Sequence, residues 1–584
     1  MCGILFSCSV FEHEQPSEHR AHLKELLKQL RDANAARGPD AQDAIVSQIN
    51  KLTLEFFSSE LRLRGSEPVS QPHRSDDGHI LCWNGEIFEG LEVLSDENDG
   101  VKLFDRLRAT HSEEKFRDEL GRIEGPYAIV YYHPHLRRVF FARDPLGRRS
   151  LLIHIPTSTS PSFVLTSVST GYFPLLTPEE LSTECIHYLD VDRLNNISNL
   201  DDFHTCLGRL SRQNDSQSLA FAEPCKVNTT LPGDPPRTAN LDDIPPHLAT
   251  SVDDLIAHLD RSVKLQTQNI PRRSEEKGKA RVAVLFSGGI DSTMLAFLAD
   301  RHVDPEDPID LLNVAFENPR KILVKAEGNI GALPKRERKA KMKDRLDYTS
   351  IDVVYDVPDR LTGRQELEEL RRLCPKRTWN FVEVDVPYEE SQAARPHVEA
   401  LMYPGRTIMD LSLAVALYFA ARGKGHIRAH PGANAEPYVS TAKVLLNGLG
   451  SDELLGGYGR HRAVFNVDGW PALISELQLE IDRIPTRNLG RDDRVISSHG
   501  KETRHPFLSL SVVAFLAQLP VHHKLDPRLA AGLGEKMLLR LAARKVGLVE
   551  ASARKKRAMQ FGSHSARMGP GESDGKGDIK LGEQ

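Results

Sequence analysis

The sequence has few cysteines and none of the spacings that would organise them. The seven cysteines of the 584 residues are odd in number and scattered, and they include no C-x-x-C pair. This pattern fits neither a disulfide framework nor a structural zinc site, and it favours a reducing compartment.

Long apolar runs and a basic bias are also missing. No run of about 18 apolar residues occurs, so the sequence predicts no membrane-spanning helix. The start carries His13, His19, Arg20 and several glutamates, unlike a secretory signal. The formal net charge is -6, which gives no reason to expect nucleic acid or an anionic membrane as partner. We therefore expect a cytoplasmic protein whose ligands must be inferred from local motifs.

The stretch from Val282 to Thr293, VAVLFSGGIDST, predicts a buried strand, a glycine turn and a helix start. Glycines allow backbone N–H groups to approach an anion closely, and the helix N-terminus adds its positive end. The stretch suits a phosphate or pyrophosphate, although the same residue types also form ordinary strand-to-helix turns. It is not a Walker A loop, which requires G-x-x-x-x-G-K-[ST].

A second glycine loop lies in Lys443 to Arg462. Val444 to Leu446 predicts a strand, and the loop that follows presents Asp452 and Glu453 side by side. Adjacent carboxylates near a phosphate loop suit Mg²⁺, which prefers oxygen ligands. The alternative is a helix N-cap with acidic residues at the positive end of the helix dipole.

Cysteine at position 2 begins a short apolar strand. Removal of Met1 would leave Cys2 with both a thiol and a free α-amino group, whose pKa of about 8 suits it to accept the thiol proton. The alternative is that Cys2 is only a small apolar strand residue.

Four further stretches occur with Cys2 in a specific order. They are RGPDAQ (37–42), LCWNGEIFEG (81–90), NDGVKLF (98–104) and GPYAIVYYHPHLRRVFFARDPLGRRSLL (125–152). Together they resemble the N-terminal-nucleophile glutaminase domain of class II glutamine amidotransferases. The resemblance implies that Cys2 attacks the carboxamide of glutamine and that Asn84 and the backbone of Gly85 form the oxyanion hole. Glu86 and Asp99 would hold the α-amino group of glutamine.

One position departs from that family. The family binds the α-carboxylate of glutamine with an arginine from an R-L-S-I-V strand, whereas this chain has Glu60-Leu61-Arg62-Leu63-Arg64-Gly65. Arg62 is our first choice for this role and Arg64 the second. The alternative is a solvated edge strand.

The second half resembles the synthetase domain of asparagine synthetase. The resemblance rests on SGGIDST, GLGSDELLGGY, ETRHPFLS (502–509) and an EKMLLR helix followed by the basic loop SARKKRAMQFGS (552–563). It implies ATP as co-substrate, with Lys556 near the adenylate as a catalytic residue and Mg²⁺ bound by Asp291 and Asp452. The implied ATP-binding residues are Leu285, Ser287, Gly288, Gly289, Asp291, Ser292, Val314, Asn447 and Gly448.

Two features differ from authentic asparagine synthetases. Their loop reads S-G-E-G-S-D-E, and this chain has Leu449 in place of the glutamate. Their aspartate-binding stretch T-x-R-A-S-T-P corresponds to Thr407–Leu413 here, which lacks the arginine. With 358–384 and 409–425, these features look like the eukaryotic asparagine synthetase domain-containing protein group.

The resemblance implies an α/β multidomain chain: an N-terminal Ntn-hydrolase αββα sandwich and a C-terminal doubly wound parallel α/β ATP-pyrophosphatase domain. The expected boundaries are 2–191 for the glutaminase domain, 192–250 for a linker, 251–565 for the synthetase domain with a basic insertion at 318–345, and 566–584 for a disordered tail. The implied function is a glutamine-dependent amide ligase that uses ATP and a carboxylate acceptor, by resemblance aspartate. A different acceptor, or a catalytically impaired scaffold, remains open, and a homodimer is compatible with the resemblance.

Several elements are predicted from pattern alone. We expect an amphipathic helix around 252–263, an apolar helix at 407–422, strands at 352–355 and 379–386, and a hairpin loop at 143–147 between strands that contain Phe140 and Leu151.

Overall fold

The computed structural model describes residues 2–9, 17–158, 160–214, 218–233, 236–238, 240–272, 277–328, 333–334, 337, 354–568 and 580. Much of the basic insertion and nearly all of the tail after Met568 lie outside these residues. Ala566 and Met568 are buried, although the tail was expected to begin at 566.

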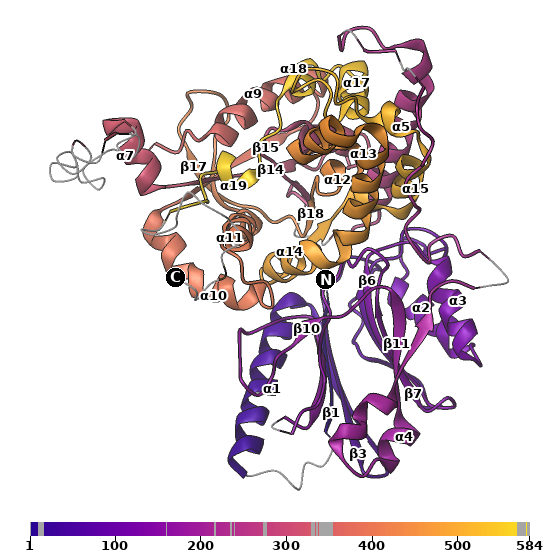
Figure 1. Ribbon diagram of the computed structural model, residues 1–584. Helices are drawn as coiled ribbons and strands as arrows, with labels where there is room; N and C mark the ends of the chain where they lie inside the picture. Colours follow the sequence, from indigo (N-terminus) through magenta and orange to yellow (C-terminus); the bar gives the residue numbers. More distant parts are fainter. Residues whose placement is uncertain are drawn as a thin grey trace.

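The N-terminal half contains two sheets packed face to face (Figure 1). The first has the order β10-β8-β9-β1-β3-β2 and the second the order β12-β11-β7-β6-β5-β4. Strand β1 shows why they pack, because its side chains alternate between two apolar layers. Ile4 and Phe6 face the second sheet, whereas Leu5 packs with Leu26 and Leu30 of α1. The bounds of these elements are β1 Gly3–Ser9, α1 Ser17–Arg37, β2 Ala41–Ile49, β3 Leu52–Glu60, β4 His73–Arg74, β5 Ile80–Gly85, α2 Asp99–Arg108, α3 Glu113–Arg122, β6 Tyr127–His133, β7 Arg138–Arg143, β8 Leu152–His154, β9 Ser162–Thr166, β10 Glu179–Glu180, β11 Cys185–Asp190, α4 Val191–Asn196, η2 Leu200–Cys206 and β12 Leu207–Ser211.

The C-terminal half is built on one sheet of order β17-β16-β15-β14-β13-β18-β19. Strands β15, β14, β13, β18 and β19 run parallel to one another. Strands β16 and β17 add an antiparallel edge next to β15. Strand β14 is buried along its whole length, as expected for a parallel strand covered by helices on both faces. The strand bounds are β13 Val282–Leu285, β14 Ile309–Phe316, β15 Trp379–Val386, β16 Lys424–Ile427, β17 Glu436–Val439, β18 Val444–Leu446 and β19 Glu502–Arg504.

Helices cover both faces of this sheet in two apolar layers. Helices α5, α6, α9 and α17 contribute to one layer, and α10, α11 and α14 contribute to the other. The helix bounds are α5 Pro246–Thr267, α6 Ile290–Asp300, α7 Pro319–Glu327, α9 Pro358–Leu373, α10 Tyr388–Met402, α11 Ile408–Arg422, α12 Ser451–Leu455, α13 Gly459–Arg487, α14 Leu489–Ser497, η6 Pro506–Leu508, α15 Leu510–Gln518, α16 Val521–Lys524, α17 Met537–Lys545, α18 Val549–Ala553 and α19 Met559–Gly562.

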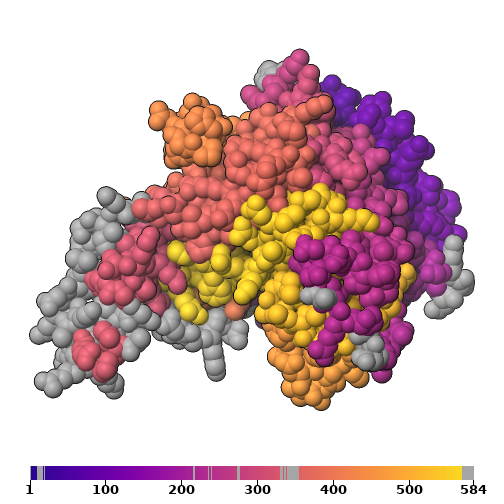
Figure 2. Space-filling view, turned by 90° about the horizontal axis from the view of Figure 1, so that it is seen from above, coloured from indigo at the N-terminus to yellow at the C-terminus, as the bar shows by residue number. Residues whose placement is uncertain are grey.

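The segment between the halves lies on the surface of the C-terminal half. Figure 2 shows this part of the chain, in magenta, against the yellow C-terminal segment. The backbone N–H of Val227 donates to Gln478 Oε1 at 2.8 Å, that of Asn228 donates to the Ala517 carbonyl at 2.7 Å, and Thr238 contacts Met537. The first part of this segment belongs to the N-terminal half instead. Helices α4 and η2 pack into its core through Leu194 and Phe203, and β12 is an edge strand of the second sheet.

Two predictions of local structure are wrong. The loop at 143–147 is not a hairpin loop, because β7 belongs to the second sheet and β8 to the first. Asp144 shapes this crossing by accepting hydrogen bonds from the backbone N–H groups of Leu146 and Arg148. The predicted strand at 352–355 is also incorrect where it is described, since Val354 and Tyr355 have no regular structure. The helix at 407–422 and the strand at 379–386 are confirmed.

The two halves meet through buried polar side chains. Asp493 on α14 forms a 2.7 Å ion pair with Arg37 at the end of α1, and both side chains are 0% exposed. Arg149 donates to the Thr503 carbonyl at 3.0 Å, and Arg494 donates to Ser150 Oγ at 2.8 Å. Charged groups are rarely buried without partners, so these pairs fix how the halves fit together.

The Arg37–Asp493 pair makes the first prediction. We expect Asp493→Ala to lower the free energy of unfolding by about 3–5 kcal/mol, because it leaves Arg37 and Arg149 buried with a partner removed. Glu550→Ala, which removes an exposed pair with Arg372, should cost less than about 1 kcal/mol. Chemical denaturation measures both, and equal small losses would show that the buried pair does not hold the halves together.

Candidate functional site

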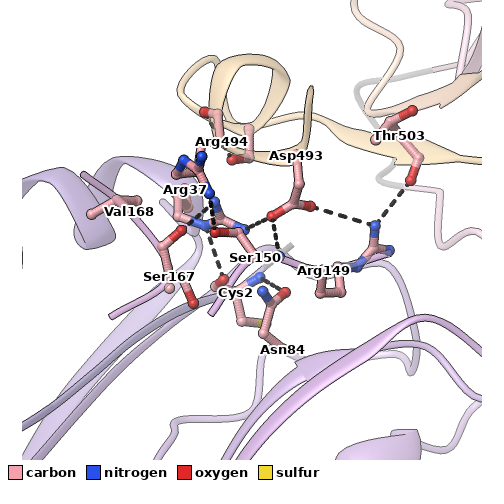
Figure 3. A network of polar contacts seen from close by, with 12 residues as sticks. Cys2, Arg37, Asn84, Arg149, Ser150, Ser167, Val168, Asp493, Arg494 and Thr503 are labelled. Atoms are coloured by element: carbon pink, nitrogen blue, oxygen red, sulfur yellow. Dashed lines mark hydrogen bonds and ion pairs between the residues drawn. The ribbon is translucent and has the colours of Figure 1, made fainter. Parts of the chain in front are cut away.

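Cys2 lies at the start of β1, where the two sheets approach the C-terminal half (Figure 3). Its backbone N–H donates to Asn84 Oδ1 at 3.0 Å, and its carbonyl accepts from Arg37 Nε at 3.1 Å. Gln71 Nε2 lies 3.7 Å from the Cys2 sulfur. The cysteine is therefore held at its backbone on both sides.

Asn84 has a free donor beside Cys2. Because Asn84 Oδ1 accepts from Cys2, the amide orientation is set and Nδ2 is the donor end. This Nδ2 is buried and has no hydrogen-bond partner among the described residues. The next residue must be glycine, since a Cβ on Gly85 would lie 2.6 Å from the Trp83 ring. An unpaired donor next to a nucleophile can stabilise a developing oxyanion.

The thiol itself is not activated by its surroundings. Burial raises the pKa of Cys2 to about 12, and the negative charges of Glu60 and Glu502 add to the rise. The neutral thiol is therefore the stable form near neutral pH. A base adjacent to the sulfur is needed for attack, and the α-amino group that Met1 removal would expose is the group suited to this role.

The predicted amino-group ligands, Glu86 and Asp99, are both buried. Glu86 Oε2 is 2.8 Å from Arg64 Nε, and Glu86 Oε1 is 3.3 Å from Arg504 Nη2. Asp99 accepts from the backbone N–H of Ile87 at 2.9 Å, and burial together with the charge of Glu86 raises the pKa of Asp99 to about 7.

The structure separates the two candidate arginines. Arg62 Nη1 donates to the Ser66 carbonyl at 2.6 Å and is not among the contacts of Glu86. Arg64 forms the ion pair with Glu86 and is buried. Arg64, the second choice from the sequence, is therefore the arginine that contacts a predicted glutamine-binding carboxylate.

An alternating chain of charges joins this site to the C-terminal half. Figure 3 shows Asp493 between Arg37 and Arg149. Arg149 also lies 2.8 Å from Glu502, and Arg504 lies 2.6 Å from Glu502. We call this set the charge chain; in order, its members are Arg37, Asp493, Arg149, Glu502, Arg504, Glu86 and Arg64.

A cleft of about 780 Å³ opens at the carboxyl ends of β13, β14 and β18. This volume is in the range of small-molecule sites, and the position is a topological switch point of the sheet. The predicted residues that line it are Leu285, Ser287, Gly289, Asp291, Ser292, Val314, Asn447, Gly448, Asp452 and Lys556. Gly288 packs against α9 instead. Its φ is +73°, and a Cβ at this position would lie only 2.5 Å from the backbone nitrogen of Gly363, so the loop requires glycine here.

Lys536 is the central residue that sequence reasoning missed. Its Nζ lies 2.7 Å from Asp291 Oδ2, 2.8 Å from Asp452 Oδ1 and 2.9 Å from Ser451 Oγ. Burial by itself would raise the pKa of Asp452, but Lys536 and Lys556, which also contacts this carboxylate, lower it well below its ordinary range. The signal was present in the sequence, because Lys536 is the lysine of the EKMLLR motif.

These residues fit a nucleotide with a divalent cation. Gly448 approaches Asp291 so closely that a Cβ would lie 2.8 Å from Asp291 Cβ, so a side chain at position 448 would displace Asp291. Lys536, Lys556 and Arg540 line the cleft and supply positive charge for phosphates. Asp291 and Asp452 carry the carboxylate oxygens that Mg²⁺ prefers, and a carboxylate has about four lone-pair sites, so contact with Lys536 at 2.7 or 2.8 Å leaves others for a cation.

The two departures noted above also line the cleft. Leu449 lines the cleft and also packs against the apolar layer. Asp410 accepts from Thr407 Oγ1 at 2.6 Å and from Arg491 Nη1 at 2.5 Å. An arginine is thus present in the cleft, but it comes from α14 and is paired internally with Asp410 and Asp492.

None of the helices in the described parts of the chain is both long and apolar enough for a bilayer crossing.

Comparison with known proteins gives three relatives of graded similarity. A family model described as asparagine synthase matches residues 465–573. Asparagine synthetase domain-containing protein 1 of Gallus gallus is 36% identical, with 97% of each chain covered. An asparagine synthetase domain-containing protein of Saccharomyces cerevisiae is 31% identical over 91% of this chain and 87% of its own. Asparagine synthetase [glutamine-hydrolyzing] 1 of the same yeast is 28% identical over 28% of this chain and 27% of its own.

Glu60 makes a prediction about pH. Burial raises the pKa of Glu60 to about 7. Because this folded value exceeds the unfolded one, ionised Glu60 costs stability as pH rises from about 4 to 7 and above. The stability of Glu60→Gln relative to the wild type should therefore increase by about 1–3 kcal/mol from pH 4 to pH 8. Denaturation at both pH values tests this, with Glu55→Gln on the exposed side of β3 as control. A pH-independent difference would contradict it.

Proposed function

The chain belongs to the asparagine synthetase domain-containing protein family, and from this premise we propose that it is a glutamine-dependent, ATP-driven amide ligase of the asparagine synthetase type. The N-terminal half, proposed as an Ntn-hydrolase domain of residues 2–191, releases ammonia from a carboxamide. The C-terminal half, proposed as an ATP-pyrophosphatase domain of residues 251–565, activates a carboxylate. The reaction that the family name suggests converts aspartate, glutamine and ATP to asparagine, glutamate, AMP and pyrophosphate.

In the first half, the Cys2 thiol attacks the carboxamide carbon and forms a glutamyl thioester as ammonia leaves. The α-amino group of Cys2 takes the thiol proton and passes it to the leaving nitrogen. Asn84 Nδ2 donates to the developing oxyanion, and this role is supported by its lack of a partner beside the cysteine among the residues that the structure describes. Water then hydrolyses the thioester to the free acid.

In the second half, the glycine loop orients the phosphates, and Lys536 and Lys556 offset their negative charge. Asp291 and Asp452 would hold Mg²⁺, which neutralises charge on the pyrophosphate leaving group when it is bound. Leu285, Val314 and Asn447 line the part of the cleft suited to the nucleoside. The observation that carries the proposal is the Asp291–Lys536–Asp452 cluster beside this loop.

A second candidate keeps this chemistry and changes the acceptor. Leu449 offers no carboxylate, and Arg491 is already paired with Asp410 and Asp492. The end of the cleft where an acceptor would bind therefore differs from the pattern of authentic asparagine synthetases. The same departures favour, as a third candidate, an impaired synthetase that serves as an interaction protein. We further propose a cytoplasmic location, and the proposed function is compatible with a homodimer.

The thiol assignment is tested by amide hydrolysis. Protein whose Met1 has been removed, as shown by intact mass spectrometry, should release ammonia from glutamine, and Cys2→Ala should abolish the release because it removes the sulfur that forms the thioester. Cys225→Ala changes a half-buried cysteine outside the site and should retain full activity. Ammonia release that survives Cys2→Ala would refute the nucleophile.

The nucleotide assignment is tested by ATP binding and by pyrophosphate release. Gly448→Ala should weaken ATP binding at least about 10-fold in calorimetry, because its Cβ would displace Asp291. Gly233→Ala, where a Cβ meets nothing within 4 Å, should leave binding unchanged.

Release of pyrophosphate from ATP identifies the acceptor. Release with aspartate supports the asparagine reaction, and release only with another acid reassigns the acceptor. Wild-type protein that binds ATP but releases no pyrophosphate with any acid would favour the interaction protein.

A further inference from the structure

Glu86 already has a cationic partner in the structure. The guanidinium of Arg64 lies against it with Nε at 2.8 Å from Oε2, and Arg64 Nη2 also donates to the Ile87 carbonyl at 3.2 Å. The other oxygen, Oε1, faces Arg504 at 3.3 Å. Both carboxylate oxygens that the resemblance assigns to a substrate ammonium group are therefore in contact with arginine.

The buried positive and negative charges around Glu86 are already balanced in number. Along the charge chain, four arginines alternate with three carboxylates, and Asp99 beside Arg64 makes a fourth acidic group. Burial alone would lower the pKa of Arg64, but the charges of Glu86, Asp99 and Glu502 raise it above its ordinary value, so Arg64 stays charged. A bound ammonium group would add an uncompensated charge in a buried region, which is costly.

Glu60 is a second acidic group close to Cys2. The pairing of β1 with β3 sets Gly3 opposite Ser59, so Glu60 lies next to Cys2, and it accepts a hydrogen bond from the Val69 N–H at 2.8 Å. Burial raises the pKa of Glu60 to about 7, so its ionised form disfavours an anionic head group beside Cys2 as the pH rises above neutral.

We propose that Arg64 is a specificity-determining residue that fills the ammonium site, so that the Cys2 pocket favours carboxamides with an uncharged head group over free glutamine. This inference rests on the proposed function and narrows the amide donor. The substrate class is a glutamine-type side chain whose α-nitrogen is acylated and whose α-carboxyl group is in amide linkage. Free glutamine binds only weakly, because its ammonium group must compete with Arg64 for Glu86.

Calorimetry on the full chain carrying Cys2→Ala tests the proposal without turnover. The ligands are L-glutamine and the neutral N-acetyl-L-glutamine methylamide. The Cys2→Ala protein should bind the neutral amide at least about 10-fold more tightly than L-glutamine. Adding Arg64→Met should tighten L-glutamine binding at least about 10-fold, because Glu86 becomes available to its ammonium group.

Two further variants separate charge from packing. Arg64→Lys keeps a cation beside Glu86 and should leave L-glutamine binding weak. Arg122→Met removes an exposed arginine that pairs with Glu119 and should change neither ligand. If Arg64→Met does not fold, Arg64→Gln, which is also neutral, takes its place.

The proposal is overturned if the Cys2→Ala protein binds L-glutamine as tightly as the neutral amide. It is equally overturned if Arg64→Met leaves L-glutamine binding unchanged, or if neither ligand binds to any variant. Failure of the proposed function is a different result. In that case the binding preferences hold, but protein with Cys2 intact hydrolyses neither amide.

Discussion

The buried charge chain from Arg37 to Arg64 is the constraint on which the rest of the structure depends. Its members come from both halves, and each carboxylate lies between two arginines. In a low-dielectric interior such a chain is tolerable only while every link is present, because removing one leaves charged neighbours without compensation. The chain of ion pairs therefore ties the relative position of the two halves to electrostatics.

The same chain touches both sites. Arg37 donates to the carbonyl of Cys2, which fixes the start of β1. At the other side, Arg504 belongs to β19, and its carbonyl accepts from the backbone N–H of Asn447 beside the glycine loop. One continuous set of hydrogen bonds and ion pairs thus links the cysteine to the nucleotide cleft. The proposed transfer of ammonia from one site to the other would benefit from such a fixed relation.

The sequence could predict features that lie within one contiguous motif, and it could not predict partners that the fold brings together. The SGGIDST loop, the strand at 379–386 and the helix at 407–422 are local and were predicted correctly. Asp493 is 456 residues from Arg37, and no local pattern marks it. The choice between Arg62 and Arg64 also lay beyond the sequence. Strand β3 ends at Glu60, so the period-two rule no longer says where either side chain points.

The departures from the family patterns leave two clusters of polar side chains in place. The unpaired Asn84 donor beside Cys2 and the Lys536 cluster beside the glycine loop, both within the described part of the chain, have the arrangement that their proposed reactions need. By contrast, the proposed places for the amide donor and the acceptor contain the Arg64–Glu86 pair, Leu449 and the Arg491–Asp410 pair. A different pair of substrates would require changes at such positions while the thiol and the lysine cluster stayed in place. Membership of the family therefore supports a synthetase-like reaction more strongly than it identifies the molecules that would react.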